Sequence, residues 1–165
     1  MATKALITSE QYLAARFERE PELVYGELME RPLPTFPHGD TQLELGSRLR
    51  ALASAHGLFS GVEVRVRMAD DLYLIPDIAV WAGPDPPQAI PVDPPLLVVE
   101  IVSRDDRLHD MFRKLAAYQA WGVETIWLVE PELKTFCVYD EGLRIVRKLT
   151  LTQFEFAITP EELFA

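Results

Sequence analysis

Apolar and polar positions alternate strictly from Gly61 to Met68, with valines and a methionine on one face and charged residues on the other. This period of two is typical of a half-buried β-strand. The short connection Ala69-Asp70-Asp71 follows it, so we expect the segment from Leu72 to Trp81 to return beside the first strand as a hairpin partner.

Two apolar runs without alternation, Leu96–Val102 and Thr125–Val129, predict buried strands. The segment between them, 106–121, predicts a helix that Gly122 closes as a C-terminal signal. A strand, a helix and a second strand in this order form a right-handed crossover unit.

The remaining predicted elements are shorter and are separated by turn residues. They comprise a helix that starts in Thr8-Ser9-Glu10-Gln11 and ends at Pro21, a strand from Leu23 to Met29 with a turn-like Tyr25-Gly26, a helix after His38-Gly39-Asp40, strands over 135–139 and 143–148, and a short helix from Thr159. Six of the 13 prolines lie between Gly83 and Pro95, which predicts a surface loop. The order of elements predicts an α/β or α+β fold, with a mixed sheet flanked by helices.

Composition narrows the class of protein. The chain has 165 residues, of which 48% are hydrophobic and 25% charged, as expected for one globular domain over 1–165. The single cysteine, Cys137, excludes an intrachain disulfide and a Cys-rich zinc site. No apolar stretch is long enough to span a bilayer, and Met1–Lys4 show no signal sequence, so we expect no membrane association and a cytoplasmic location. The net charge of −10 argues against general affinity for nucleic acid but leaves room for a locally basic groove.

Glu100 is the most informative residue, because it interrupts the apolar run Leu96–Val102. A buried carboxylate is costly unless it is paired, protonated or metal-bound. Asp77 lies in a similar apolar setting on the preceding strand, and Lys114 follows on the predicted helix. Neighbouring strands lie about 4.8 Å apart, so two carboxylates on them can share one Mg²⁺, which needs few protein oxygens.

Each of these residues also has a simpler interpretation. A buried glutamate is as often a structural residue paired with a cation. The Pro76-Asp77 pair is common at strand starts, and most helix lysines are solvated. The combination of the three residues, in this order, favours a site.

Longer motifs add a family resemblance. The segments Ile75-Pro76-Asp77-Ile78-Ala79-Val80 and Leu97-Val98-Val99-Glu100-Ile101-Val102-Ser103 resemble the PD-(D/E)XK nuclease superfamily. More closely, the chain is similar to the Uma-type restriction-endonuclease-like family. That similarity continues through Tyr25-Gly26-Glu27-Leu28, His38, Arg113–Tyr118, and Trp121–Pro131.

The resemblance implies a restriction-endonuclease-like fold and a set of site residues. Asp77 and Glu100 would bind Mg²⁺ or Mn²⁺, and Lys114 would be the catalytic lysine. The Glu-x-Lys pattern has Val102 at its lysine position here, and the lysine of the Uma-type pattern lies on the helix, which fits Lys114. Glu27 would add a carboxylate, directly or through water, and His38 would contact phosphate or support the site. The alternative is that Glu27 is an ordinary strand or turn residue and that His38 is a helix cap or a surface histidine.

Two classes of function follow. The first is a Mg²⁺-dependent endonuclease that hydrolyses phosphodiester bonds of nucleic acid, DNA rather than RNA, with Lys114 assisting the attacking water. Because a nuclease that cuts both strands needs two sites, a homodimer is expected for it. The second is a non-catalytic regulatory or interaction protein that retains the nuclease-like fold, in which Glu100 and Lys114 form a buried ion pair.

Overall fold

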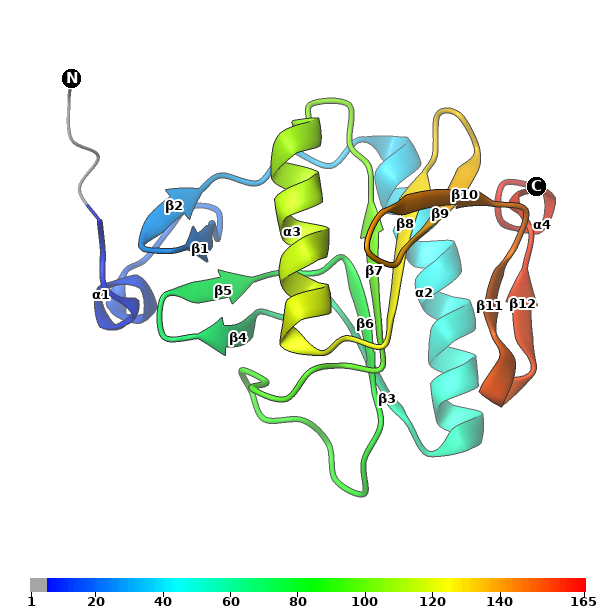
Figure 1. Cartoon of the computed structure of the whole chain (residues 1–165), viewed down its shortest axis with the longest axis horizontal. Helices are drawn as coiled ribbons and strands as arrows, with labels where there is room; N and C mark the ends of the chain where they lie inside the picture. Colours follow the sequence, from blue (N-terminus) through cyan, green and yellow to red (C-terminus); the bar gives the residue numbers. More distant parts are fainter. Residues whose placement is uncertain (1–5) are drawn as a thin grey trace.

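A computed structural model describes residues 6–165 of the chain. Its centre is a mixed six-stranded sheet in the order β10-β9-β8-β7-β6-β3 (Figure 1). The strands are β3 (Phe59–Val62), β6 (Ile78–Trp81), β7 (Leu97–Ile101), β8 (Thr125–Glu130), β9 (Thr135–Tyr139) and β10 (Leu143–Val146). Mixed sheets and flanking helices confirm the fold class that the sequence predicted.

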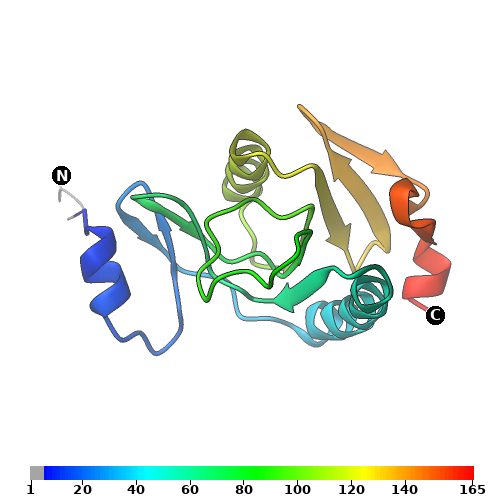
Figure 2. The same ribbon diagram turned by 90° about the horizontal axis from the view of Figure 1, so that it is seen from below.

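Two long helices cover the two faces of this sheet. Helix α2 (Phe36–His56) packs on one face and α3 (Leu108–Trp121) on the other, as the view from below shows (Figure 2). Alternate residues of the strands divide between the two cores. Those that pack with α2 include Ile78, Val80, Leu97, Val99 and Ile101, and those that pack with α3 include Ala79, Trp81, Val98, Ile126 and Leu128.

The predicted crossover unit is confirmed. Strands β7 and β8 are parallel, with Leu97 paired to Thr125 and Ile101 to Val129, and α3 connects them. Gly122 ends α3 with φ of 109°, a left-handed conformation that glycine adopts without a steric penalty. The other pairings in the central sheet are antiparallel.

A second, four-stranded sheet lies beside the first, in the order β2-β1-β5-β4. Its strands are β1 (Glu22–Val24), β2 (Glu27–Met29), β4 (Val66–Ala69) and β5 (Leu72–Leu74). The continuous strand predicted from Leu23 to Met29 is therefore wrong. The segment is a hairpin, because Tyr25 and Gly26, with φ of 52° and 82°, reverse the chain. Its first strand begins at Glu22, one residue earlier than predicted.

The predicted hairpin from Gly61 to Trp81 exists, but both of its strands are divided between the two sheets. The first bends at Glu63, whose φ is 50°, so that β3 joins the central sheet and β4 the second sheet. Its partner is interrupted at 75–77, between β5 and β6. The two interruptions lie side by side, since the amide of Glu63 donates to the carbonyl of Asp77 at 3.2 Å. The apolar alternation continues through the bend, which is why the sequence suggested one strand.

The ends of the chain cover the outer surfaces. Helix α1 (Ser9–Ala14) has the capping box predicted at Thr8 and Gln11, but it ends well before Pro21. At the other end, β11 (Leu149–Leu151) and β12 (Phe156–Ile158), joined by a 3₁₀ turn (Thr152–Phe154), form an unpredicted hairpin, and the predicted last helix is α4 (Pro160–Leu163). The proline-rich segment 83–95 has no helix or strand, as expected. Within residues 6–165, no helix has the length and apolar character needed to cross a membrane.

Candidate functional site

Asp77 and Glu100 face each other across neighbouring strands. The antiparallel register pairs Ile78 with Val99, which brings Asp77, just before β6, opposite Glu100 on β7. Because Ala79 and Val98 belong to the core under α3, the period of two puts both carboxylates on the α3 face of the sheet. Their exposed fractions are 4% and 2%. The sequence therefore predicted correctly that Glu100 is buried and that the two acids are neighbours.

Lys114 reaches these carboxylates from α3. Its Nζ atom lies 2.9 Å from Oε1 of Glu100 and 2.7 Å from Oε1 of Glu22, and it donates to the carbonyl of Ile75 at 3.2 Å. Glu100 belongs to the central sheet, whereas Glu22 belongs to β1 of the second sheet. The ammonium thus holds the two sheets together at the same point where the acids converge.

Tyr118 is a site residue that sequence reasoning missed. It lies one turn after Lys114 on α3, and its hydroxyl donates to Oε1 of Glu100 at 2.8 Å. Its side chain is completely buried, with the ring in the core beneath α3. A tyrosine on the apolar face of a helix resembles a packing residue, and only its spacing of four from Lys114 connects it with the site.

Glu22 is the second residue that was missed. It is 8% exposed, and its Oε1 atom accepts the amide hydrogen of Ile75 at 2.8 Å as well as the Lys114 ammonium. The predicted helix ended at Pro21 and the predicted strand began at Leu23, one residue too late, so Glu22 lay outside every predicted element. Glu27, the expected additional carboxylate, is half-buried on β2 and is not among the residues that line the cavity of the site.

Asp77 is held by donors from three directions. Its Oδ2 atom accepts the amide hydrogen of Ile101 at 2.7 Å and lies 3.4 Å from Nε2 of His38, while Oδ1 lies 3.5 Å from the Arg31 guanidinium. Burial acts to raise the pKa of Asp77, but His38, Lys114 and the Ile101 amide outweigh it, and the pKa is lowered. His38 is 5% exposed in the first turn of α2, so it supports Asp77 from inside the protein.

The charges of the cluster set the protonation of Glu100. Lys114 contacts the carboxylates of Glu22 and Glu100, the charge of Asp77 also acts on it, and Arg31 contacts Asp77. Burial raises the pKa of Glu100 to about 8; Lys114 acts against this rise, and the charges of Asp77 and Glu22 add to it. The pKa of Lys114 is raised because the attraction of the three carboxylates exceeds its burial cost. The lysine is therefore charged near neutral pH, and burial is the cause that shifts the pKa of Glu100 upward against the pull of this charge.

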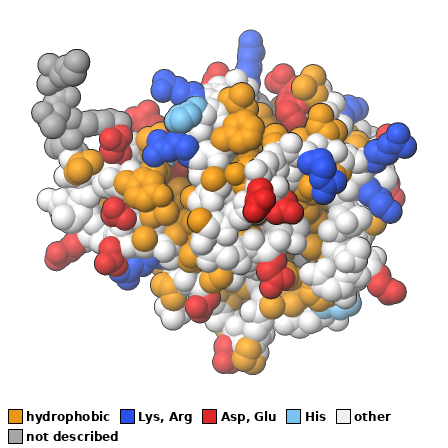
Figure 3. Space-filling view, viewed as in Figure 1, with side chains coloured by type: hydrophobic (Ala, Val, Ile, Leu, Met, Phe, Trp, Pro, Cys, Tyr) orange, Lys and Arg blue, Asp and Glu red, His pale blue; other side chains and the backbone are white. Residues whose placement is uncertain are grey.

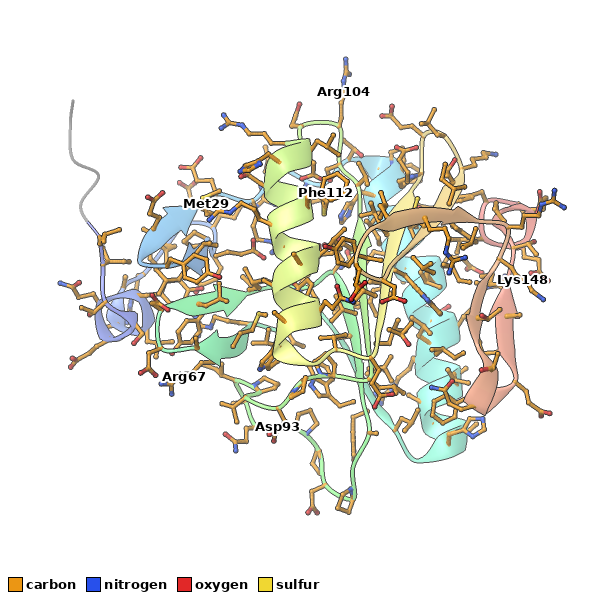
Figure 4. The ribbon with its side chains drawn as sticks, viewed as in Figure 1. Met29, Arg67, Asp93, Arg104, Phe112 and Lys148 are labelled. Atoms are coloured by element: carbon orange, nitrogen blue, oxygen red, sulfur yellow. The ribbon has the colours of Figure 1, made fainter. Side chains whose placement is uncertain are left out.

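The cluster opens into a cavity of about 840 Å³ between α3 and the second sheet. Glu22, Asp77, Glu100 and Lys114 line it together with His38. The cavity also has an uncharged wall, to which Met29 of β2 contributes; Figure 4 shows this residue on the second sheet, beside α3. A substrate that enters the cavity meets both a charged cluster and an apolar surface.

The donor set fits a hard cation of the Mg²⁺ type. Mg²⁺ is commonly bound by one or two carboxylates and keeps several waters. Asp77 and Glu100 supply two such carboxylates on adjacent strands. Among residues 6–165, no group of three or more His, Cys, Asp or Glu side chains is arranged to hold a metal ion. Asp77 and Glu100 are the two carboxylates that could hold such an ion.

Comparisons with known proteins identify the family. The model of the Uma2 family, described as "putative restriction endonuclease", matches residues 9–165, and the chain belongs to this family. A crystal structure of a "putative nuclease belonging to DUF820" from Anabaena variabilis ATCC 29413 is similar, with a TM-score of 0.84 and 20% sequence identity over 96% of this chain and 97% of that chain. That likeness shows a shared fold. No curated protein matches the chain.

Proposed function

We propose that this member of the Uma2 family is a Mg²⁺- or Mn²⁺-dependent nuclease that hydrolyses phosphodiester bonds. The observation that supports it best is the convergence of Asp77, Glu100 and Lys114, from two strands and a helix, at the wall of one cavity. A structural ion pair needs one carboxylate for one lysine, whereas this lysine contacts two, and the charge of Asp77 also acts on it.

Asp77 and Glu100 would hold the metal ion. When bound, such an ion polarises a phosphoryl oxygen and lowers the pKa of a coordinated water. It would also favour the ionised form of Glu100, whose pKa burial raises. Asp77, whose pKa is lowered, is ionised without it.

In this proposal, Lys114 supplies a positive charge in addition to that of the metal ion. The protonated amine has Glu22, Glu100 and the carbonyl of Ile75 as acceptors, and it would exchange one of them for a phosphate oxygen. It would then stabilise the negative charge that develops on the phosphate oxygens. Glu22 orients the amine, and Tyr118 orients the carboxylate of Glu100. His38 does the same for Asp77, and the role of Glu27 stays a prediction that substitution tests.

The alternative is a non-catalytic interaction protein that keeps the nuclease-like fold. The direct contact of 2.9 Å between Lys114 and Glu100 supports it, because this pair is complete without a metal. The two functions differ in their response to metal. An enzyme binds Mg²⁺ at Asp77 and Glu100, whereas an interaction protein leaves the ion pair unchanged in excess Mg²⁺.

The decisive experiment measures Mg²⁺-dependent cleavage of mixed DNA and RNA substrates. Glu100→Gln keeps the shape of the side chain and removes its charge, and we expect it to reduce cleavage by at least about 100-fold. Glu124→Gln, at an exposed position outside the cavity, is the matched control and should leave cleavage unchanged. Equal activity of Glu100→Gln and the parent would refute the proposed site.

The substrate and assembly are part of the proposal. DNA is the expected substrate, ahead of RNA, and the same assay compares them directly. A homodimer is expected if both strands of a duplex are cut together, and sedimentation of the purified protein measures it. A monomer that cuts one strand at a time would remove the need for a second site.

A further inference from the structure

The turn between β1 and β2 carries an aromatic residue where small residues are favoured. Val24 pairs with Glu27, so Tyr25 and Gly26 form a two-residue loop. Their φ values of 52° and 82° are those of a type I′ turn, which prefers Asn, Asp or Gly at its first position. A bulky side chain with this backbone conformation is an outlier, and the fold alone gives no reason for it.

Tyr25 lies outside the buried apolar cores. It is 56% exposed, and among the described residues it has no hydrogen bond, ion pair or ring contact. It nevertheless lines the same cavity as the carboxylates. An exposed, strained aromatic residue at the edge of a candidate active site is a candidate for ligand contact.

Uncharged residues extend the cavity away from the carboxylates, and we call this part the apolar arm. On the second sheet it consists of Tyr25, Val24, Leu72 and Leu74, and on α3 of Ala116, Ala117 and Ala120. The small alanine side chains leave space between the helix and the sheet. Figure 3 shows apolar side chains among charged ones on the face of the molecule that carries α3.

Arg113 is a cation of the cavity lining that comes from the same helix as Lys114 and the alanines. Arg113 lines the cavity directly before Lys114, and it is exposed. Within the described part of the chain it forms no ion pair, in contrast to Arg31, which contacts Asp77 and Glu63. A guanidinium without a partner is suited to a phosphate group.

We propose that the apolar arm binds an unpaired base of a single-stranded nucleic acid, which stacks on Tyr25 while Arg113 contacts the adjoining phosphate. The inference rests on the proposed function, because the next phosphodiester would then lie at Asp77 and Glu100. These carboxylates are 4% and 2% exposed, so a phosphodiester must enter the cavity to reach them. A base stacked within a duplex has no free face for the ring, whereas an unpaired base does.

The test measures binding without cleavage. Fluorescence anisotropy is recorded with Ca²⁺ in place of Mg²⁺, using a labelled ten-residue oligothymidylate, the corresponding oligouridylate, an abasic strand of equal length, and a blunt duplex. The two homopolymers distinguish DNA from RNA, and the abasic strand removes the bases while keeping the phosphates. The parent should bind the base-containing single strands more tightly than the abasic strand and the duplex.

Two substitutions of Tyr25 separate the ring from the turn. Tyr25→Phe keeps the ring and should bind like the parent. Tyr25→Asn suits the type I′ turn, so its melting temperature should equal or exceed that of the parent, but its affinity for the oligothymidylate should fall at least about fivefold. Its affinity for the abasic strand should not change.

Other results would overturn the inference. These are equal binding of the oligothymidylate by Tyr25→Asn and the parent, or binding of the duplex as tight as that of the single strand. The proposed function is judged separately, by cleavage with Mg²⁺. If cleavage and binding do not depend on Tyr25, the nuclease proposal stands and the proposal of base binding by the apolar arm is rejected. If binding depends on the bases and on Tyr25 but no cleavage occurs, base binding stands and the nuclease proposal is rejected.

Discussion

Lys114 and Tyr118 lie one turn apart on α3, and both donate to the carboxylate of Glu100. The lysine supplies a charge and the tyrosine a neutral hydroxyl, so Glu100 is fixed in one orientation between them. In the proposed nuclease, the hydroxyl would act on the chemistry only through Glu100, and Tyr118 would be a positioning residue.

Replacing Tyr118 by phenylalanine should therefore affect metal binding more than folding. The lost hydrogen bond stabilised the ionised form of Glu100, so its pKa should rise further and the activity profile should shift to higher pH. We expect Mg²⁺ affinity to fall roughly 10- to 100-fold and stability to fall by about 1 kcal/mol. Tyr139→Phe, in a partly buried tyrosine of the same core, is the control for losing a hydroxyl. Equal losses in both variants would reduce Tyr118 to a packing residue.

Glu100 makes stability depend on pH. Its pKa in the folded protein, about 8, is above the value of an exposed glutamate, so the folded state binds more protons than the unfolded state between these values. The free energy of unfolding should therefore decrease as pH rises from about 4.5 to 8. Glu100→Gln should lose this dependence and be at least as stable as the parent at pH 8. Chemical denaturation at several pH values measures both.

The same experiment separates the two functional classes. If Glu100 is ionised and serves as one half of a structural pair, Glu100→Gln leaves Lys114 with one fewer carboxylate. The variant should then be less stable by about 3–5 kcal/mol at neutral pH. That outcome, together with a parent that shows no metal-dependent activity, would favour the interaction protein.

Mg²⁺ should stabilise the folded protein, because it binds the native cluster and not the unfolded chain. It competes with the proton on Glu100, so the rise in melting temperature should be larger at pH 8 than at pH 6. The rise should be absent in Glu100→Gln and in Asp77→Asn. Differential scanning calorimetry with and without EDTA gives the comparison, and a rise that persists in both variants would place the cation elsewhere.

Glu22 and Glu27 provide a matched pair of substitutions on one hairpin. Glu22→Gln removes a carboxylate that Lys114 contacts at 2.7 Å, so nuclease activity should fall roughly 10- to 100-fold. Glu27→Gln changes a residue outside the cavity lining, and its activity should stay near that of the parent. A larger effect of Glu27→Gln would support its role as an additional carboxylate and weaken the assignment of Glu22.

The central part of the fold and site was predictable because its signals are local. The apolar run around Glu100 defines a buried strand, and the carboxylate within it is an anomaly that needs a partner. The helix that follows this strand ends at Gly122, and Lys114 on that helix lies within reach of the strand. These features depend on residues that are close in sequence, apart from the pairing with Asp77.

The missed features depend on tertiary structure. The alternation from Gly61 to Met68 continues through a bend, so it cannot show that β3 and β4 belong to different sheets. Glu22 reaches the charged cluster only because β1 pairs with β5, which brings Glu22 beside Ile75. A single sequence carries no local signal for either event.

The ion pairs of Lys114 also have a mechanical consequence. One ammonium group is bound to Glu100 in the central sheet and to Glu22 in the second sheet, next to the point where both long strands are interrupted. A change in the angle between the two sheets would therefore also change the contacts within the charged cluster. In the proposed enzyme, a substrate phosphate that drew the ammonium away from Glu22 would loosen the contact between the two sheets and widen the cavity.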